Sequence, residues 1–278
     1  NHHPLEVAAD IAGLDHMLDG RLNLGISPGG LLSDAEAFGT LDADRTAMFI
    51  EAVSILERLW TEKPPYDIRG AYWTISTART LDAELGMGEV PRPLQAPSPP
   101  IFTTVMEPHS LGIYKAAERG WIPISANFTL AEWLPSHWQK AAKGAAAGDR
   151  ALTIDDWRVA RTIHVDETGE RARSYVFAAD SPYRHYYWNL LRKFTRFGKL
   201  AQFQPSGSPV NAVPDLDTLL DKLVICGDAV EVADELNGLR DDIGPFGTLL
   251  YTGVDWADPD TAERSMRLMA EKVLPRIQ

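Results

Sequence analysis

The sequence predicts an α/β fold, and three observations lead to it. Short segments with strand-like alternation are separated along the chain by longer segments with helical periodicity. Of the 278 residues, 45% are hydrophobic, which is enough for a sizeable core. No internal repeat or low-complexity tract interrupts the alternation. Strands that alternate with helices are joined by helical crossovers, so we expect a mainly parallel sheet.

The first hundred residues predict two helices, a strand and a hairpin. Pro4 is tolerated in the first turn of a helix. Arg69-Gly70 marks the turn of the hairpin, and a proline-rich connection follows over 90–100. In chain order we expect a helix over 5–18, a strand over 21–27, an irregular loop over 27–44, an amphipathic helix over 45–60 and a hairpin over 66–75.

The rest of the chain repeats the alternation of strands and helices. Pro108 is expected to open a helix that ends near residue 120, and Pro135 should kink or divide the next one. Asp228 is a possible N-cap, and residues 169–221 form an aromatic, mostly helical excursion. Strands are expected over 101–105, 121–125, 156–165 and 246–253, a short strand or loop over 223–227, and further helices over 130–148, 228–242 and 258–277.

Five of these strands are of the kind that forms an α/β barrel, and they begin at Leu22, Ile101, Trp121, Trp157 and Phe246. A barrel needs eight strands and usually about 250 residues or more, whereas an open doubly wound sheet would need no further strands. The chain opens on a helix with no strand before it, and the aromatic excursion after the fourth strand is typical of a loop insertion in a barrel. Both features favour an incomplete barrel.

The composition excludes some classes of protein. The chain has 27 Lys and Arg against 39 Asp and Glu, for a formal net charge of −12. We therefore expect no general binding to nucleic acid or anionic membranes, because phosphate attraction needs a basic face. The lone Cys226 cannot form an internal disulfide, and no apolar run approaches the roughly 20 residues that cross a bilayer. A reducing compartment, hence a cytoplasmic location, is expected.

Several motifs that carry chemistry do not occur in the sequence. No spacing of His, Cys and carboxylates matches a zinc site, so no metal is expected. The phosphate-binding loop of ATPases, the dinucleotide fingerprint G-x-G-x-x-G and the G-x-S-x-G turn of hydrolases are also missing.

Five segments carry a specific resemblance through their shared order: 2–29, 31–45, 93–104, 116–128 and 246–276. Together they resemble the bacterial luciferase-like, flavin-dependent monooxygenase family, above all its two-component members such as the limonene and diketocamphane monooxygenases. The resemblance implies a (β/α)8 TIM barrel of luciferase-like type, with FMN at the carboxyl ends of its strands. On this alignment the chain begins just after the family's third strand. We therefore expect a single barrel domain over 1–278 that lacks strands 1–3, which residues before Asn1 would supply, and a lid insertion at 170–215.

The resemblance also implies an activity. Reduced FMN, supplied by a separate flavin reductase, would react with O₂ to give a C4a-peroxyflavin that oxygenates a small apolar organic substrate, and a homodimer is expected. Two alternatives remain at this point. One is a deazaflavin-dependent hydride-transfer oxidoreductase on the same fold, and the other is a non-catalytic luciferase-like subunit. The aromatic segment 170–215 would exclude water as a lid, or it is a plain packing helix.

The resemblance places the cofactor's phosphate near Arg45, because luciferases have a phosphate-binding arginine after a similar "FGT" run. A second family arginine falls at Pro28, so that contact is lost or replaced. Alternatively, Arg45 is a solvated side chain on the first helical turn, where a cation is poorly placed. Ser110 and Glu107 lie in the strand-to-helix turn where luciferases use hydroxyl groups, although Ser110 is equally explained as a helix cap.

The remaining candidates are two glycines and two histidines. Gly29 and Gly30 would let the backbone approach the flavin closely. His2 and His3 lie where the third strand would end, and a histidine there could act as a general base or hold the flavin's edge. Alternatively, both are exposed residues of a frayed terminus. The family's catalytic histidine falls before Asn1, and the other histidines considered, His16, His137 and His164, are interpreted as structural.

Overall fold

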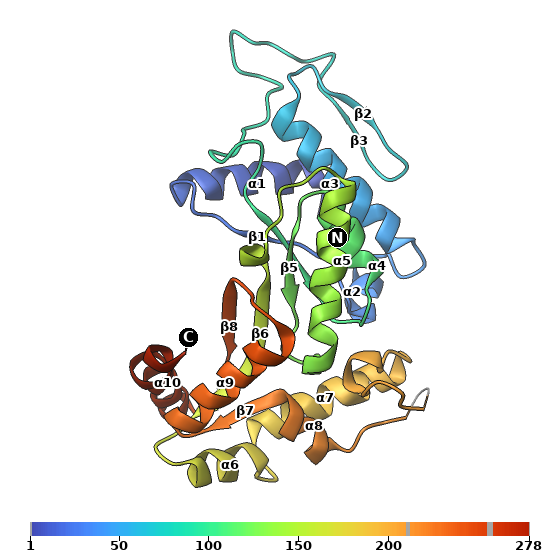
Figure 1. Cartoon of the computed structure of the whole chain (residues 1–278). Coiled ribbons are helices and arrows are strands. Elements are labelled where there is room, and N and C mark those ends of the chain that lie inside the picture. The colour runs from blue at the N-terminus through green and yellow to red at the C-terminus, as the bar shows by residue number, and fades with distance from the viewer. Residues whose placement is uncertain (1, 210–211, 255–257, 278) are drawn as a thin grey trace. The chain divides into compact units, whose positions relative to one another are not determined.

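The computed structural model describes residues 2–209, 212–254 and 258–277 (Figure 1). They form two compact units, divided after Phe102. We describe each unit by itself. No helix among the described residues is long and apolar enough to span a membrane.

The first unit is built around helices α1 (Pro4–Met17) and α3 (Arg45–Thr61). The two helices pack on the antiparallel hairpin of β2 (Asp67–Arg69) and β3 (Thr74–Ser76) (Figure 1). The Trp60 indole donates a hydrogen bond to the Ala8 carbonyl (3.1 Å), which ties α3 to α1. The core of the unit consists of Ala8, Ile11, Ile55, Leu56, Leu59, Trp60, Tyr66, Ile68 and Ile75. Both predicted helices and the hairpin are confirmed.

Two features of the first unit differ from the prediction. The strand expected over 21–27 is reduced to β1 (Leu24–Gly25), which pairs in parallel with the first two residues of β4 (Ile101–Val105). The loop expected over 27–44 contains a short helix, α2 (Leu32–Ala37). The six residues of α2 make fewer than two turns and bury only Ala35, so no apolar periodicity in the sequence indicates this helix.

The second unit begins within β4 and contains most of the parallel sheet: the end of β4, β5 (Ile122–Ser125), β6 (Arg158–Val165), β7 (Val224–Gly227) and β8 (Thr248–Thr252). Arg158 and Val159 of β6 pair with β5 on one side and with β8 on the other. The strand order is β1–β4–β5–β6–β7, and β8 also pairs with β6. The five strands expected in a barrel, β1, β4, β5, β6 and β8, are therefore neighbours in chain order. β7, the segment left open between strand and loop, pairs with the last four residues of β6.

Helices follow the strands of this unit as predicted. They are α4 (Leu111–Glu118), α5 (Leu134–Ala147), α6 (Gly169–Phe177), α7 (Pro182–Arg196), α8 (Leu216–Leu223), α9 (Ala229–Ile243) and α10 (Pro259–Leu268). Pro135 divides the helix expected over 130–148, because a 3₁₀ turn precedes α5 and the proline occupies its first turn. α4 begins at Leu111 rather than at Pro108, with Ser110 as its N-cap. Asp228 caps α9 as predicted.

Two hydrophobic clusters support the sheet of the second unit. One packs β6 and β7 against α9 and the end of the chain. The other packs the segment expected to be a lid, 170–215, against the helix that follows it, α8: the buried side chains are Tyr183, Tyr187, Leu191 and Phe194 of α7 and Leu219 and Leu220 of α8. The segment is thus largely helical, and its apolar face is shared with α8. Its function as a lid stays a prediction, as does a single domain over 1–278.

Candidate functional site

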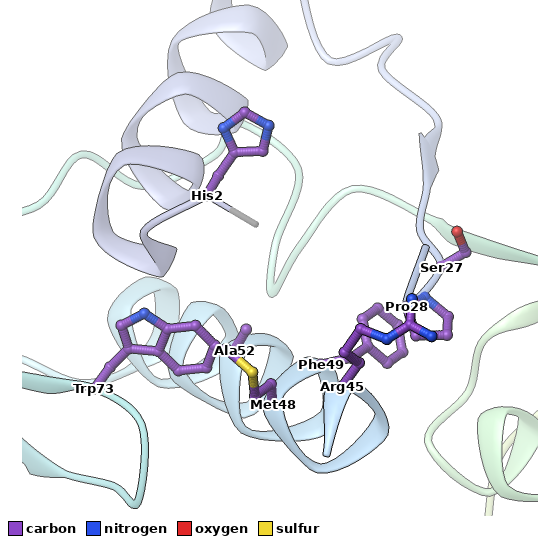
Figure 2. Close-up of a pocket in the computed structure, with 8 residues that line it drawn as sticks. All are labelled: His2, Ser27, Pro28, Arg45, Met48, Phe49, Ala52 and Trp73. Atoms are coloured by element: carbon purple, nitrogen blue, oxygen red, sulfur yellow. The ribbon is translucent and has the colours of Figure 1, made fainter. Parts of the chain in front are cut away.

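The first unit contains a small pocket that joins several of the predicted site residues (Figure 2). Its volume is about 80 Å³. It is lined by His2, Ser27, Pro28, Arg45, Met48, Phe49, Ala52 and Trp73. The structure therefore brings His2, the loop at Pro28 and Arg45 to one place, although they are far apart in the sequence.

One face of α3 forms the floor of this pocket. Arg45, Met48, Phe49 and Ala52 are spaced i, i+3, i+4 and i+7, so they lie along one side of the helix. Figure 2 shows Arg45 and Trp73 at opposite ends of this row. The start of α3 is fixed by Asp44, whose carboxylate accepts a hydrogen bond from the Ala47 N–H (2.9 Å). Arg45 is consequently the first helical residue.

Arg45 is half-buried, and its guanidinium forms no hydrogen bond or ion pair within the described residues. A cation at a helix N-terminus is unfavourable by itself, because the helix dipole is positive there. An anion in the pocket would remove that penalty and pair with the guanidinium. Ser27 adds an exposed hydroxyl to the same wall. The pocket thus combines a guanidinium and a hydroxyl with an apolar side.

Trp73 is placed in the pocket by Glu51. The Glu51 carboxylate accepts hydrogen bonds from the N–H groups of Ala71, Tyr72 and Trp73, at 2.8–3.0 Å. Burial raises the pKa of Glu51, but these three donors outweigh it and hold the pKa below its ordinary value. The sequence analysis did not find Glu51, because nothing in the local pattern connects it to a hairpin twenty residues later.

The two histidines at the start of the chain have different surroundings. His2 lines the pocket, and its ring lies 6.3 Å from the ring of Phe38, centroid to centroid. His3 is the N-cap of α1 and accepts a hydrogen bond from the Leu5 N–H through Nδ1 (3.2 Å). The role of His3 in this structure is therefore that of a helix cap, whereas His2 faces the pocket. Gly29 and Gly30 follow Pro28 and are exposed, and neither lines the pocket.

Glu107 and Ser110 belong to the second unit, in the turn between β4 and α4. The Ser110 hydroxyl accepts a hydrogen bond from the Ile113 N–H (3.3 Å), so it satisfies the helix that follows. Glu107 is exposed and pairs with Lys199 (3.4 Å). The turn is held by α5, where the Ser136 hydroxyl accepts a hydrogen bond from the His109 N–H (3.0 Å). The structure thus shows Ser110 as the cap of α4 and Glu107 in an exposed ion pair, and a contact of either residue with a phosphate stays a prediction.

A larger pocket, of about 640 Å³, lies in the second unit. Its walls are one face of α7 and the carboxyl end of β8 with the two residues that follow, Gly253 and Val254. Pockets of this size, roughly 300–1,000 Å³, hold whole organic ligands. The lining side chains of α7 are Pro182, His185, Tyr186, Asn189, Leu190 and Lys193. The sequence analysis named this segment for its aromatic side chains but did not find the partners at β8.

A buried chain of hydrogen bonds lies beside this second pocket. Asn127, at the end of β5, donates to the Thr162 hydroxyl (2.8 Å) and to the Tyr186 hydroxyl (3.4 Å). Thr162 in turn bonds the Tyr187 hydroxyl (2.8 Å). This hydrogen-bond network joins β6 and α7 to Asn127, just after β5, and its members are up to sixty residues apart in the sequence. Sequence patterns give no signal for such a contact.

The two buried histidines of the second unit have structural partners. His137 Nδ1 bonds the Ser125 hydroxyl (2.9 Å), which also accepts from the Trp157 indole (2.9 Å). His164 Nδ1 bonds the Tyr183 hydroxyl (3.1 Å). Burial lowers the pKa of each imidazole to about 4, so both are neutral at physiological pH. The structural interpretation of these two residues is confirmed.

Comparison with known proteins supports the family resemblance. The chain is 30% identical to 4-hydroxyprotoasukamycin monooxygenase of Streptomyces nodosus subsp. asukaensis, over 99% of this chain and 70% of the relative. It is 27% identical to limonene 1,2-monooxygenase of Rhodococcus erythropolis, over 99% of this chain and 65% of the relative.

A solved structure gives the same result for the fold. The oxygenating constituent of 3,6-diketocamphane monooxygenase from Pseudomonas putida, a type II Baeyer-Villiger monooxygenase in complex with FMN, matches with a TM-score of 0.85 and 25% identity. The match covers all of this chain and 77% of that one. The expected α/β fold of luciferase-like type is confirmed. Residues 1–244 match the model of the luciferase-like monooxygenases, and the chain belongs to that family.

Proposed function

We propose that this chain is the oxygenase component of a two-component monooxygenase, which uses reduced FMN and O₂ to oxygenate a small apolar organic substrate. The single observation that carries the proposal to this chain's own residues is the Arg45 guanidinium in the pocket of the first unit, which has no partner among the residues that the structure describes. Membership of the family and the FMN complex of a 25%-identical relative support the choice of cofactor.

The pocket fits the phosphate end of FMN. A volume of about 80 Å³ exceeds the roughly 10–15 Å³ that one water needs and is well below the roughly 300 Å³ of a pocket for a whole organic ligand. Arg45 would neutralise the phosphate, and Ser27 would donate a hydrogen bond to it. His2 would stand at the edge of the same site. Reduced FMN, when bound, supplies the electrons that activate O₂.

The pocket of the second unit would hold the apolar substrate. The carboxyl ends of barrel strands are where ligands bind in folds of this type, and this pocket includes the end of β8. The aromatic face of α7 would exclude water from the reaction, which protects a reactive oxygenating species from hydrolysis and decay. A flavin reductase is the partner that this chemistry requires, and a homodimer is proposed from the family likeness.

The test compares cofactors that differ in one group at a time. Reduced FMN, reduced riboflavin and a reduced deazaflavin are titrated into the protein under anaerobic conditions, and dissociation constants are measured by fluorescence. We expect FMN to bind more tightly than riboflavin, because only FMN has the phosphate. Tighter binding of the deazaflavin would contradict the proposal. Oxygen incorporation into an apolar substrate, in the presence of NADH, FMN and a flavin reductase, separates an active oxygenase from a non-catalytic subunit.

A further inference from the structure

The helix α7 has two different faces. Tyr183, Tyr187, Leu191 and Phe194 recur at helical spacing and are buried in the cluster with α8. The opposite stripe lines the 640 Å³ pocket, and Tyr186 is the residue of that stripe closest in sequence to the buried Tyr187. Tyr186 is half-buried, so its ring contributes to the pocket wall while its hydroxyl reaches the polar chain that starts at Asn127.

The direction of each hydrogen bond in this network can be assigned by starting from its last acceptor, the Leu223 carbonyl. Tyr187 donates to the Leu223 carbonyl (3.4 Å), which has no proton to give. The Tyr187 oxygen must then accept the proton of Thr162 in their 2.8 Å contact. Thr162 has thus used its proton, and its oxygen accepts from the Asn127 amide (2.8 Å). The hydroxyl protons of Tyr187 and Thr162 are therefore both used in hydrogen bonds within this network.

The same assignment leaves the hydroxyl proton of Tyr186 without a hydrogen-bond acceptor among the described residues. The second N–H of the Asn127 amide points at the Tyr186 oxygen, which is therefore an acceptor in that contact (3.4 Å). The Tyr186 proton has no acceptor among the residues that the structure describes. Burial raises the pKa of Tyr186, so the hydroxyl keeps this proton at neutral pH. A phenol in a pocket wall with an uncommitted proton is a hydrogen-bond donor for a ligand.

We infer that Tyr186 determines substrate specificity: it donates its proton to an uncharged oxygen acceptor of an apolar ligand in this pocket, so that small apolar molecules with one such acceptor are the substrate class. The apolar surface of the pocket selects the hydrocarbon part of the ligand, and the single neutral donor selects an acceptor without charge. The assignment of the ligand as substrate rests on the proposed function, whereas the binding itself does not require a flavin.

The experiment measures binding to the flavin-free protein with a matched pair of probes. The ketone is 4-tert-butylcyclohexanone, and the hydrocarbon is tert-butylcyclohexane, in which a methylene replaces the carbonyl. Dissociation constants are obtained by competition against a fluorescent apolar dye. We expect Tyr186→Phe to weaken ketone binding about 2- to 10-fold, the range of one neutral hydrogen bond. Hydrocarbon binding should change less than 2-fold.

Two control variants make the result specific. Tyr187→Phe is the same substitution on the next residue, but Tyr187 is buried and does not line the pocket, so the ratio of ketone to hydrocarbon affinity should be unchanged. Lys193→Met removes the charged donor of the same wall and should also leave that ratio unchanged, if Tyr186 is the anchor. Thermal unfolding of each variant checks that it is folded.

Three results would overturn the inference. They are failure of both probes to bind, an equal loss of both probes in Tyr186→Phe, and a selective loss of the ketone in Tyr187→Phe or Lys193→Met. The FMN titration distinguishes this failure from a failure of the proposed function. If FMN still binds through Arg45 while the ketone shows no preference for Tyr186, only the substrate class is wrong.

Discussion

The Glu51 carboxylate accepts a hydrogen bond from the Trp73 N–H (3.0 Å), and this contact fixes Trp73 at one end of the pocket that Arg45 also lines. Glu51 lies in the middle of α3, one helical position before Ala52, which lines the same pocket. The helix therefore supplies the pocket floor directly and positions the hairpin that carries the opposite wall. Gly70 makes the approach possible, because a Cβ at that position would lie 2.0 Å from the Glu51 Oε1 atom.

Glu51→Gln should destabilise the hairpin and displace Trp73. An amide offers only one acceptor oxygen, and its NH₂ group would face the backbone donors that the carboxylate now satisfies. We expect a loss of about 1–2 kcal/mol in the free energy of unfolding, from hydrogen bonds to a charged group that is partly exposed. Chemical denaturation measures it, with exposed Glu84→Gln as the control. Since the folded pKa of Glu51 is lowered, its contribution is present above the ordinary carboxyl pKa and is lost as the pH falls through the folded value.

Arg45→Ala should weaken FMN binding by about 1.5–3 kcal/mol, or roughly 10- to 150-fold, the range of a charged hydrogen bond. Riboflavin binding should change less than 2-fold, because riboflavin has no phosphate. Arg58→Ala is the matched control: it lies on the same helix but is engaged with Glu62 (2.6 Å). Unchanged FMN affinity in folded Arg45→Ala protein would show that the phosphate binds elsewhere.

Elements that depend on neighbouring residues could be predicted from the sequence, whereas elements that depend on tertiary contacts could not. Asp228 was recognised as a cap and Pro135 as a helix break because each acts through its own neighbours. Helix α2 was missed because a segment that buries only Ala35 has no apolar period. Ser110 is the N-cap of α4, which is the alternative that the same residue pattern predicts equally well, and its contact with a phosphate stays a prediction.

The candidate site was partly predictable for the same reason. Arg45 was found through the family resemblance, and its position at the start of α3 follows from the cap at Asp44. The contacts of Asn127 with Thr162 and Tyr186 join residues 35 and 59 positions apart. No spacing rule covers such distances, because the two partners meet only after β5, β6 and α7 have packed together. Tyr186 lies in the aromatic segment 170–215, and only the hydrogen-bond directions distinguish it from the other aromatic residues there.

Gly144→Ala should be strongly destabilising, although alanine is the better helix former. Helices α4 and α5 approach so closely that a Cβ on Gly144 would lie 2.1 Å from the Tyr114 carbonyl oxygen. We expect a loss of about 2–3 kcal/mol through overpacking. Gly238→Ala, in α9, is the matched control: nothing lies within 4 Å of its added Cβ, so the same change should stabilise the protein by about 1 kcal/mol. Equal effects of the two substitutions on thermal unfolding would contradict the packing of α4 on α5.

The buried histidines should make the protein less stable in mild acid. Burial is the main reason that the pKa of His137 and of His164 falls to about 4. For His137, the Glu107 carbonyl opposes this lowering of the pKa and His109 adds to it. For His164, Asp166 opposes it and Arg264 adds to it. Between about pH 6.5 and pH 4 the unfolded chain binds these protons and the folded one does not, so stability falls as the pH falls. Each histidine contributes about 2–4 kcal/mol over this window. His137→Asn, which keeps an acceptor for Ser125, should reduce the slope of unfolding free energy against pH.

Segment 170–215 should behave as a lid if it closes over a substrate. Lids come from the less stable part of a structure, so its amides should exchange hydrogen faster than those of β6 in the empty protein and slow down when flavin and substrate are bound. The structure makes the test more specific. The buried face of α7 packs on α8, so the change should be largest at the pocket-lining face around Tyr186 and Asn189 and in the connection over 204–209. Protection equal to that of β6 without ligand would instead identify the segment as a fixed packing layer, and the pocket would then be open to substrate at all times.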